Sequence, residues 1–317
     1  GPQLQRPEFR IIWEQSAFPG QLQQYNVDLV HGLVNVLPLT SSVPGVVTVH
    51  DLSFVREPET LPRLKRAYLS RLCRASVNRA RRVIAVSRQT ADDLVRFFDV
   101  DAHKIDVIYN GVGSEFSPGE PVEIEEFRRQ RGLPARFLLF VGTLEPRKNL
   151  AMLVRAFARW RTQAPQTAQS VKLVLAGGKG WYYEQIFATV RELGLDDDVL
   201  FPGFVPFDEL VDWYRAAEGF VYPSRFEGFG LPLLEAMACG TPALCSRAGS
   251  LLEVAGDAAL TFALNDENGL VAALERLISD EDLRRELRQA GLAQASNFSW
   301  ARTARETVDV YQQAYVG

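Results

Sequence analysis

The sequence predicts an α/β fold with two domains, each built on a parallel sheet. Short, β-branched apolar stretches alternate with helical patterns from one end of the chain to the other, which is typical of such sheets. A length of 317 residues favours two domains at roughly 150 residues each. With 47% apolar and 23% charged residues, the composition is that of a globular protein and excludes a mainly disordered chain.

We expect about five strands in the first domain, followed by a linker. The strands are Phe9–Trp13, Val27–His31, Val46–His50, Val83–Val86 and Asp106–Tyr109. Ser117–Pro121, with two prolines and a glycine, is typical of a linker, and a polar helix over Glu123–Arg131 follows it. We therefore place the boundary near residue 132, which gives domains of 1–131 and 132–317, and expect the last helix to pack back on the first domain.

The second domain has about six expected strands, enough for one complete doubly wound sheet. They are Phe137–Val141, Val171–Ala176, Val199–Phe201, Phe220–Tyr222, Ala243–Cys245 and Ala259–Phe262. Expected helices are Leu150–Thr162, Tyr182–Leu193, Phe207–Ala217, Leu231–Met237, Glu267–Ile278, Glu281–Ala295 and Trp300–Tyr315. Open parallel sheets place ligands at the carboxyl ends of their strands, so two such domains facing each other would form a cleft.

Charge, cysteine content and hydropathy exclude several classes of partner. Lys and Arg number 35 against 39 Asp and Glu, and the net charge of −4 gives no reason to expect a nucleic-acid partner. The three cysteines form no CxxC pair and support neither a disulfide framework nor a zinc site, so a cytoplasmic location is the default expectation. The sequence has no run of 18 apolar residues that would span a membrane.

One segment departs from this balance, because residues 63–82 hold eight Lys and Arg and no acid. Leu61, Leu64, Tyr68, Leu72 and Ala75 recur at intervals of three and four, which predicts a helix with one apolar face and a basic remainder. One interpretation is a helix that packs on the core and leaves its charges to solvent. The other is docking to an anionic membrane surface or a phosphate-bearing acceptor, and hence a peripheral location at the inner face of a membrane.

The most informative stretch is Ser224–Glu235, where a strand gives way to a glycine-rich loop and then to a helix. The loop N–H groups and the helix N-terminus would direct positive partial charge toward an incoming anion. Glu227 on the loop and Glu235 on the helix are carboxylates suited to accept both hydroxyls of a sugar diol. The alternative is a tight turn with two solvated glutamates.

This stretch resembles the E-x7-E motif of retaining GT-B glycosyltransferases of family 4. Further segments, in the right order along the chain, are similar to the same family, so the resemblance covers nearly the whole chain from about residue 11. These segments are Thr48–Phe54, Val86–Ser87, Val107–Val112, Phe140–Asn149, Leu175–Trp181, Phe201–Val205 and Ala238–Pro242. The resemblance implies two Rossmann-like domains facing a cleft.

The resemblance assigns donor binding to residues of the second domain. Glu227 would contact the hydroxyls of the donor sugar near the reacting carbon, and Glu235 would bind the nucleotide ribose. Arg147 and Lys148 would hold the diphosphate, which chemistry also supports, because fixed cations stabilise a leaving diphosphate. Without the family, a solvated helix start explains these two cations equally well. The other donor-binding positions are Val205, beside the base, and Gly228, Phe229, Gly230 and Leu231, where the loop enters the helix.

His50 is the catalytic candidate of the first domain. It lies at the carboxyl end of an expected strand and precedes Asp51. In the family, this position faces the transferred sugar and orients it from the opposite wall of the cleft. The alternative is a structural role, which is the more common one for a lone histidine.

The reaction implied by the resemblance is transfer of a hexose from a nucleotide-diphosphate sugar, with retention at the anomeric carbon. The sequence places no second carboxylate as the nucleophile of a retaining glycosidase. The resemblance implies that the departing phosphate helps to deprotonate the acceptor. We expect no metal and no cofactor, because Arg147 and Lys148 supply positive charge and the site region has no Asp-x-Asp cluster. Gly142–Asn149 resembles the corresponding segment of mannosyl- and related transferases, which favours GDP-mannose over UDP-glucose as the donor, and the acceptor is unknown.

Full relatives begin with a strand and a glycine-rich loop, and this sequence has no such element before Phe9. At roughly 30 residues for each βα unit, we expect the first domain to lack about two units. Two alternatives to a working transferase follow. One is a nucleotide-sugar-binding fragment that has little turnover or needs a partner segment. The other is a nucleotide-sugar epimerase, which can share the two-domain cleft.

Overall fold

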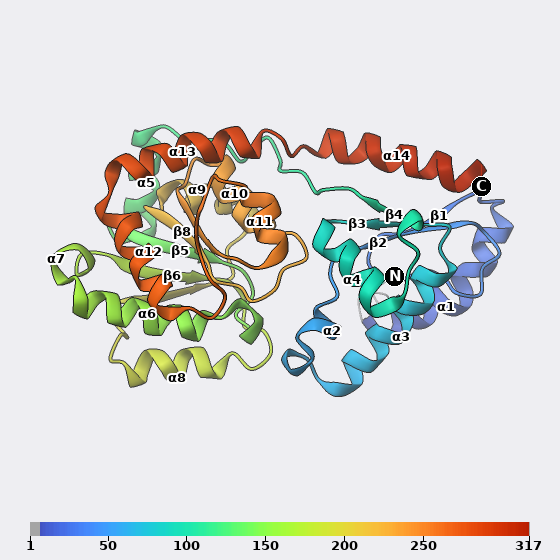
Figure 1. Ribbon diagram of the computed structural model, residues 1–317, viewed down its shortest axis with the longest axis horizontal. Helices are drawn as coiled ribbons and strands as arrows, with labels where there is room; N and C mark the ends of the chain where they lie inside the picture. The colour runs from blue at the N-terminus through green and yellow to red at the C-terminus, as the bar shows by residue number, and fades with distance from the viewer. Residues whose placement is uncertain (1–6, 317) are drawn as a thin grey trace. The chain divides into compact units, whose positions relative to one another are not determined.

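The computed structural model describes residues 7–316, and the chain divides into two compact units. Unit 1 comprises the chain up to Gly111 together with the segment from Trp300, and unit 2 is Val112–Ser299. The expected α/β fold with parallel sheets is confirmed in both units (Figure 1).

The boundary between the units lies at Val112 and not near residue 132. The helix expected as the end of the first domain, α5 (Pro121–Arg131), packs against α9 (Phe207–Ala216) of unit 2. The Nε of Arg128 donates to the carbonyl of Ala216 at 3.1 Å, which attaches α5 to unit 2. Sequence composition marks a linker but does not show on which sheet the following helix packs.

Unit 1 is built on a four-stranded parallel sheet in the order β1-β2-β3-β4. One face packs Val47 and Val83 into a core that also contains Val77, from the basic helix. The other face packs Val46 and Ile84 against Val310 of the last helix, which therefore belongs to unit 1. The elements are α1 (Pro7–Gln24), β1 (Val30–Gly32), β2 (Gly45–Val49), α2 (Ser53–Arg56), α3 (Arg63–Arg79), β3 (Arg82–Ala85), α4 (Arg88–Phe98), β4 (Ile105–Val107) and α14 (Trp300–Val316).

The strand expected at Phe9–Trp13 is wrong, because this segment lies in α1. A short apolar run cannot be assigned to strand or helix by its periodicity alone. Pro7 stands at the first position of the helix, where its fixed φ and missing N–H are tolerated. Trp13 then stacks on Phe18 one and a half turns later, with ring centroids 4.8 Å apart.

Unit 2 contains a six-stranded parallel sheet in the order β10-β9-β8-β5-β6-β7. Counted from β5, this is the doubly wound order 3-2-1-4-5-6, whose direction reverses between β5 and β8. The strands are β5 (Phe137–Val141), β6 (Lys172–Ala176), β7 (Val199–Gly203), β8 (Gly219–Tyr222), β9 (Ala243–Ser246) and β10 (Leu260–Phe262). Ligands of such sheets bind outside the carboxyl ends of the strands at this reversal.

Helices cover both faces of this sheet and bury its β-branched and aromatic side chains (Figure 1). Trp160 and Tyr214 are fully buried, and Phe140 stacks on Tyr222 across β5 and β8 with ring centroids 5.8 Å apart. Besides α5 and α9, the helices are α6 (Leu150–Gln163), α7 (Pro165–Ala168), α8 (Glu184–Glu192), α10 (Leu231–Ala238), α11 (Gly249–Ala255), α12 (Glu267–Ser279) and α13 (Glu281–Ala295). A rigid, well-packed support thus lies beneath the strand ends.

Candidate active site

Two loops meet at the carboxyl ends of β5 and β8, at the reversal of the unit 2 sheet. The loop after β5 contains a 3-10 turn, η4 (Pro146–Lys148), and the loop after β8 runs through Glu227 to the start of α10. The N–H of Arg225 donates to the carbonyl of Arg147 at 2.9 Å and fixes the two loops to each other. The fold therefore brings together residues that are about eighty positions apart in the sequence.

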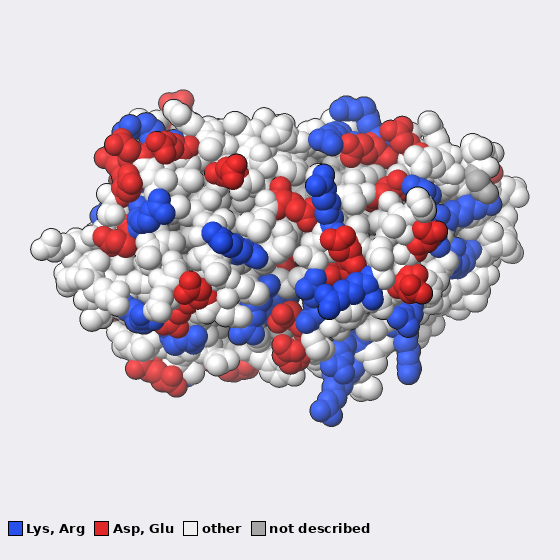
Figure 2. Space-filling view, viewed as in Figure 1, with Lys and Arg blue, Asp and Glu red and all other residues white. Residues whose placement is uncertain are grey.

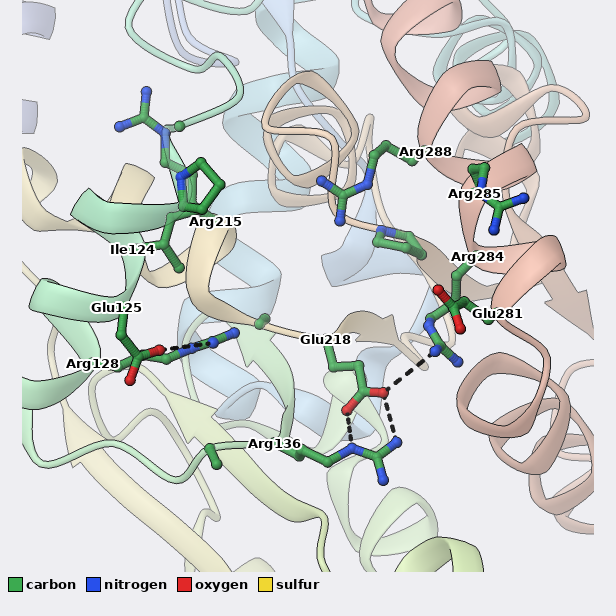
Figure 3. A pocket seen from close by; sticks show the side chains of 15 residues that line it. Ile124, Glu125, Arg128, Arg136, Arg215, Glu218, Glu281, Arg284, Arg285 and Arg288 are labelled. Atoms are coloured by element: carbon green, nitrogen blue, oxygen red, sulfur yellow. Dashed lines mark hydrogen bonds and ion pairs between the residues drawn. The ribbon is translucent and has the colours of Figure 1, made fainter.

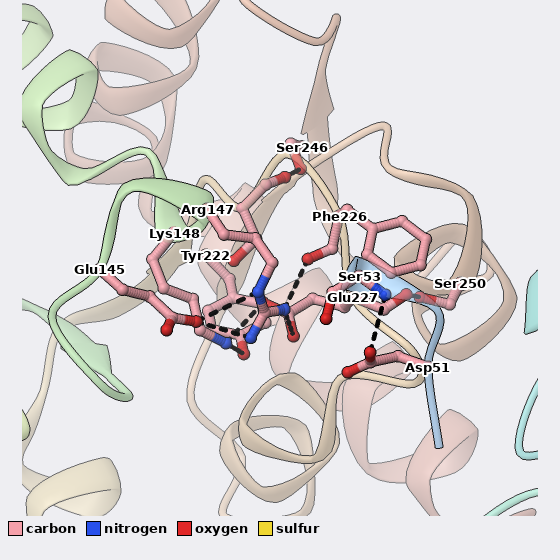
Figure 4. Close-up of polar contacts among 11 residues, drawn as sticks. Asp51, Ser53, Glu145, Arg147, Lys148, Tyr222, Phe226, Glu227, Ser246 and Ser250 are labelled. Carbon is pink, nitrogen blue, oxygen red and sulfur yellow. Dashed lines mark hydrogen bonds and ion pairs between the residues drawn. The ribbon is translucent and has the colours of Figure 1, made fainter. Parts of the chain in front are cut away.

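Glu227 accepts from both of the cations expected to hold the diphosphate (Figure 4). Lys148 Nζ donates to Oε1 at 2.6 Å, and Arg147 Nη1 donates to Oε2 at 2.9 Å. The Lys148 ammonium also donates to the Tyr222 hydroxyl at 2.9 Å. The structure thus joins three predicted site residues in one ion-paired group, which we call the Glu227 cluster: Glu227, Arg147 and Lys148.

Further contacts hold Arg147 in place. Its Nη2 and Nε donate to Oε1 of Glu145 at 2.7 and 3.1 Å, and its Nη1 donates to the carbonyl of Phe226 at 2.8 Å. Glu145 was not among the predicted site residues. Its place two residues before Arg147, on the loop that follows a buried strand, was the signal that could have identified it.

The Glu227 cluster is withdrawn from solvent, with Glu227 exposed by 7% and Lys148 by 6%. Burial alone raises the pKa of Glu227, but the charges of Lys148 and Arg147 outweigh it and bring that pKa down to about 2. Burial lowers the pKa of Lys148, and the neighbouring Glu227 opposes that effect. Glu227 is therefore an anion at neutral pH, and the interpretation of it as a solvated loop glutamate is wrong.

The Glu227 loop enters α10 through a sharp turn. Gly230 has φ of 109°, and a Cβ there would lie 2.5 Å from Leu251 Cδ2, so this position requires glycine. The Ser250 hydroxyl donates to the carbonyl of Glu227 at 2.6 Å. Phe229 buries its ring against Phe298 with centroids 5.9 Å apart, so its side chain supports the loop from inside.

Glu235 lies on α10, which begins at Leu231, and does not contact Arg147 or Lys148. It is half-buried, and the Tyr214 hydroxyl donates to its Oε2 at 2.8 Å. Burial raises the pKa of Glu235, while the Tyr214 hydrogen bond opposes this shift. The sequence pattern does not predict Tyr214 as a site residue, because a tyrosine within a helix is usually part of the core. Among residues 7–316, Tyr214 is the one hydrogen-bond partner of the Glu235 carboxylate, and it occupies Oε2 and not Oε1.

Val205 and His50 lie outside the Glu227 cluster. Val205 follows β7, is half-buried, and lines a cavity together with Phe204 and Trp213. His50 belongs to unit 1 and is exposed at the carboxyl end of β2. Its Nε2 donates to the carbonyl of Leu33 at 2.8 Å, so in this structure the ring holds the loop after β1.

Residues 7–316 contain no candidate metal cluster and no helix that could cross a membrane. Within that range, no three His, Cys, Asp or Glu side chains are grouped so that they could hold a metal ion. Over the same residues, no helix combines the length and apolarity that crossing a membrane requires.

Two family models together match almost the entire chain. The model described as "Glycosyltransferase Family 4" matches residues 2–116, and the model described as "Glycosyl transferases group 1" matches residues 123–294. The chain belongs to glycosyltransferase family 4. It is therefore a hexosyltransferase, and the resemblance seen in the sequence is confirmed at the level of the family and of the GT-B fold.

Individual relatives agree with this assignment. The glycosyltransferase is 32% identical over 292 residues to O-antigen chain mannosyltransferase B of Escherichia coli, covering 92% of this chain and 76% of that protein. It is also 32% identical over 292 residues to a D-inositol 3-phosphate glycosyltransferase of Corynebacterium kroppenstedtii, covering 86% of this chain and 62% of that protein.

Solved structures show the same fold. Sucrose-phosphate synthase from Thermosynechococcus elongatus superposes with a TM-score of 0.79 at 27% identity, over 95% of this chain and 77% of the other. Anabaena HepE, solved in complex with UDP and glucose, also gives 0.79, at 21% identity over 95% of this chain and 83% of the other. The glycosyltransferase thus shares its fold with a sucrose-phosphate synthase and with a protein that was solved in complex with UDP and glucose.

Proposed function

We propose that this glycosyltransferase moves a hexose from a nucleoside-diphosphate sugar to its acceptor with retention at the anomeric carbon. The observation that carries the proposal is the Glu227 cluster at the carboxyl ends of β5 and β8, with its two fixed cations. A leaving nucleoside diphosphate gains negative charge, and preorganised cations stabilise such charge most strongly where water is excluded. Neither a metal nor a cofactor is needed for this role.

In this proposal, the Glu227 carboxylate takes the place of the diphosphate while the site is empty. Lys148 and Arg147 would transfer part of their hydrogen bonding to the phosphates when the donor binds. Glu227 would then be able to accept from the hydroxyls of the donor sugar. The carboxylate would thus serve the empty site as a counter-ion and the loaded site as a sugar ligand. The backbone at Gly228 and Gly230 would approach the phosphates.

The nucleotide would extend from the Glu227 cluster toward α10. Glu235 keeps one carboxylate oxygen available beside Tyr214 and would accept from the ribose hydroxyls. Val205, with Phe204 exposed by 78% next to it, would lie beside the base. GDP-mannose remains the first choice of donor, supported by similarity to the O-antigen chain mannosyltransferase. UDP-glucose is the second choice.

The test is a panel of nucleotides and nucleotide sugars titrated against the whole chain, with Glu235→Ala as the diagnostic variant. We expect a loss of about 1.5–3 kcal/mol in nucleotide binding, since a charged double acceptor for the ribose is removed. Glu192→Ala, an exposed change in α8, is the matched control and should bind like the wild type. Unchanged nucleotide affinity in a folded Glu235→Ala variant would contradict the ribose assignment.

Turnover on the same panel separates the alternatives. Binding without transfer would favour a nucleotide-sugar-binding protein that needs a further segment. Isomerisation of the donor sugar without an acceptor would favour an epimerase. Transfer with an inverted anomeric product would overturn retention while leaving the donor site intact. His50→Ala would address the proposed role of the histidine in orienting the sugar, with lower transfer and unchanged nucleotide binding as the expected result.

We also propose that α3 docks on an anionic membrane surface from a cytoplasmic location. The packed side of this helix includes the buried Cys73, Ser76 and Val77 and the partly buried Leu69. The predicted apolar face is therefore only partly correct, because Leu64 is exposed by 87%. Lys and Arg side chains gather over the α2–α3 region (Figure 2). An exposed leucine among cations is typical of interfacial helices.

Some cations of the basic segment serve the fold instead. Arg74 donates to the carbonyl of Phe97, and Arg79 donates to the carbonyl of Val43 at 3.0 Å. The exposed positions Arg63, Lys65 and Arg71 therefore make the cleaner test. Replacing all three with Gln should weaken co-sedimentation with vesicles that contain phosphatidylglycerol, and wild-type binding should fall with salt because exposed charges are screened within about 10 Å at 0.1 M.

The matched control removes three exposed arginines elsewhere: Arg129, Arg191 and Arg305. Binding that ignores both salt and the α3 changes, or that falls equally in the control, would leave α3 with a packing role only.

A further inference from the structure

A second cation-rich pocket lies at the opposite edge of the unit 2 sheet. Its floor is formed by residues that directly precede the strands: Arg136 before β5, Glu218 before β8 and Pro242 before β9. These are the amino ends of the parallel strands, whereas the Glu227 cluster lies at their carboxyl ends. The pocket has a volume of about 670 Å³, and α5, α9 and α13 supply the rest of its wall. We call it the arginine pocket (Figure 3).

Six arginines line the arginine pocket, against three glutamates. The arginines are Arg128, Arg136, Arg215, Arg284, Arg285 and Arg288. Two of them have partners outside the lining, because Arg215 pairs with Asp212 at 3.1 Å and Arg285 with Asp282 at 2.8 Å. Counting these two acids as well, positive charge still exceeds negative charge by one.

Backbone carbonyls fix several of these guanidinium groups in addition to ion pairs such as Arg215 with Asp212 and, at 3.6 Å, Arg128 with Glu125. Arg128 donates to Ala216, Arg215 donates through Nε to Ser117 at 2.7 Å, and Arg284 donates through Nη1 to Leu277 at 3.0 Å. A carbonyl holds the orientation of a guanidinium without cancelling its charge. These three side chains are only 18–25% exposed, so solvent screens them weakly.

The single carboxylate at the centre of the arginine pocket is Glu218. Arg136 binds it in a bidentate manner, with Nη2 to Oε1 at 2.7 Å and Nε to Oε2 at 2.8 Å. Arg284 approaches the same carboxylate only to 3.8 Å, which is beyond hydrogen-bond length. Both oxygens of Glu218 therefore accept hydrogen bonds from Arg136. The Nη2 group of Arg284 makes no hydrogen bond to Glu218 and can donate to another acceptor.

Arg288 extends from α13 toward the middle of the arginine pocket (Figure 3). Its side chain is exposed, and none of the described residues forms a recorded hydrogen bond or ion pair with it. Arg284 and Arg288 stand one helical turn apart, so they present two guanidinium groups on one side of α13.

The geometry points to a second ligand site in this glycosyltransferase: the arginine pocket binds a phosphate-bearing molecule. Guanidinium groups offer forked pairs of N–H donors that match phosphate oxygens, and several fixed forks around one cavity suit a diphosphate or a closely spaced pair of phosphates. The arginine pocket can bind a ligand independently of the donor site, because the two sites lie at opposite edges of the same sheet. Either a soluble phosphate compound or a phospholipid headgroup would present this chemistry.

The experiment titrates inorganic pyrophosphate into the whole chain and follows binding by calorimetry. Four proteins are compared: the wild type, the double variant Arg284→Gln/Arg288→Gln, the donor-site variant Arg147→Ala and the control Arg129→Gln. Arg129 lies on α5 beside the pocket but does not line it, and it is exposed. We expect the double variant to weaken one pyrophosphate site about tenfold, the effect of losing roughly one charge-assisted hydrogen bond.

Arg147→Ala and Arg129→Gln should keep this site. Pyrophosphate binding that is unaffected by the double variant, or that disappears entirely in Arg147→Ala, would overturn the proposal. Failure of the donor assignment would leave this outcome untouched, so the two proposals fail separately. Arg284 donates hydrogen bonds to backbone carbonyls, so the double variant could also disturb the fold. Arg288→Gln alone therefore provides a second test, and we expect it to lower the affinity for pyrophosphate about threefold.

Vesicles identify the source of the phosphate. The double variant is placed in a chain that already carries the three α3 changes, and co-sedimentation with phosphatidylglycerol vesicles is measured. A further loss of vesicle binding would identify a lipid headgroup. Unchanged vesicle binding, together with the loss of pyrophosphate binding, would identify a soluble phosphate compound.

Discussion

The two edges of the unit 2 sheet hold cations in different ways. At the carboxyl edge, Arg147 and Lys148 are paired with the buried carboxylate of Glu227. At the amino edge, Arg128 and Arg284 donate to backbone carbonyls, and their nearest carboxylates, Glu125 and Glu218, lie farther away at 3.6 and 3.8 Å. The cations of the carboxyl edge are thus paired with a buried carboxylate, whereas the arginine pocket at the amino edge has an excess of one positive charge.

This difference predicts how strongly each edge is coupled to the stability of the fold. Removing one partner from a buried ion pair leaves a charge without solvent and is costly. Removing a cation that donates to a carbonyl near the surface costs less stability, because water can replace the cation as the donor to that carbonyl. We therefore expect large effects on unfolding at the carboxyl edge and small ones at the amino edge.

The largest effect is expected for Lys148→Met. This change keeps the bulk of the side chain but leaves Glu227 with Arg147 alone and removes the donor to the Tyr222 hydroxyl. We expect the free energy of unfolding to fall by about 3–5 kcal/mol in urea denaturation. Lys172→Met, at a more exposed ion pair with Asp198 at the other end of the sheet, is the control. Equal losses in both variants would remove the distinction between the two edges.

The next effect is a dependence of stability on pH. The pKa of Glu227 is about 2 in the folded protein, against 4.5 for the ordinary group. A lowered pKa stabilises the fold fully above the unfolded value, and this stabilisation is lost as the pH falls from about 4.5 toward 2. The amount is about 3 kcal/mol, from roughly 1.4 kcal/mol for each pKa unit.

Glu227→Gln should therefore be less stable than the wild type at pH 7, and the difference should shrink at pH 3. Exposed Glu192→Gln should follow the wild type at both pH values.

In the same Glu227→Gln protein, the rate of sugar transfer should fall about a hundredfold, which is the effect typical of losing a preorganised electrostatic group. Binding of nucleoside diphosphate should stay or strengthen, because the cations lose their internal counter-ion. Equal loss of binding and transfer would mean that Glu227 only supports the loop.

Arg147→Ala is expected to have an intermediate effect on ligands. It should weaken the binding of a nucleoside diphosphate by about 1.5–3 kcal/mol, because a charged donor to the second phosphate is removed. Binding of the corresponding monophosphate should weaken less. Calorimetry with both nucleotides measures the difference. Arg191→Ala, an exposed change in α8, is the control. The same loss for both nucleotides would argue against a role at the diphosphate.

The smallest effects are expected at the amino edge. Arg136→Gln breaks a partly exposed pair with Glu218 and should cost about 1 kcal/mol or less in unfolding free energy. Arg288→Gln, which removes an exposed side chain, should change stability by no more than about 0.5 kcal/mol. Thermal unfolding of both variants measures this. Losses comparable to that of Lys148→Met would show that the arginine pocket is part of the structural core.

The sequence was a reliable guide wherever the pattern is local. Buried strands such as Phe137–Val141 are short apolar runs between turn residues, and the six expected in the second domain all lie in the observed sheet. The segment Phe9–Trp13 failed for the same reason that others succeeded, since an apolar run alone does not distinguish a strand from a helix. The boundary near residue 132 failed because the packing partner of α5 is distant in the sequence.

The sequence by itself therefore determined the fold class and the family, and it predicted which residues would meet a phosphate and a sugar. Only the tertiary structure decided that Lys148 and Arg147 meet on the two oxygens of Glu227, and that Tyr214 holds Glu235. Only the tertiary structure, too, gathered the arginines of α5, α9 and α13 around the amino ends of the strands. The physical reason is that ion pairing and burial depend on distances between residues far apart in the chain, and local patterns of hydrophobicity carry no information about those distances.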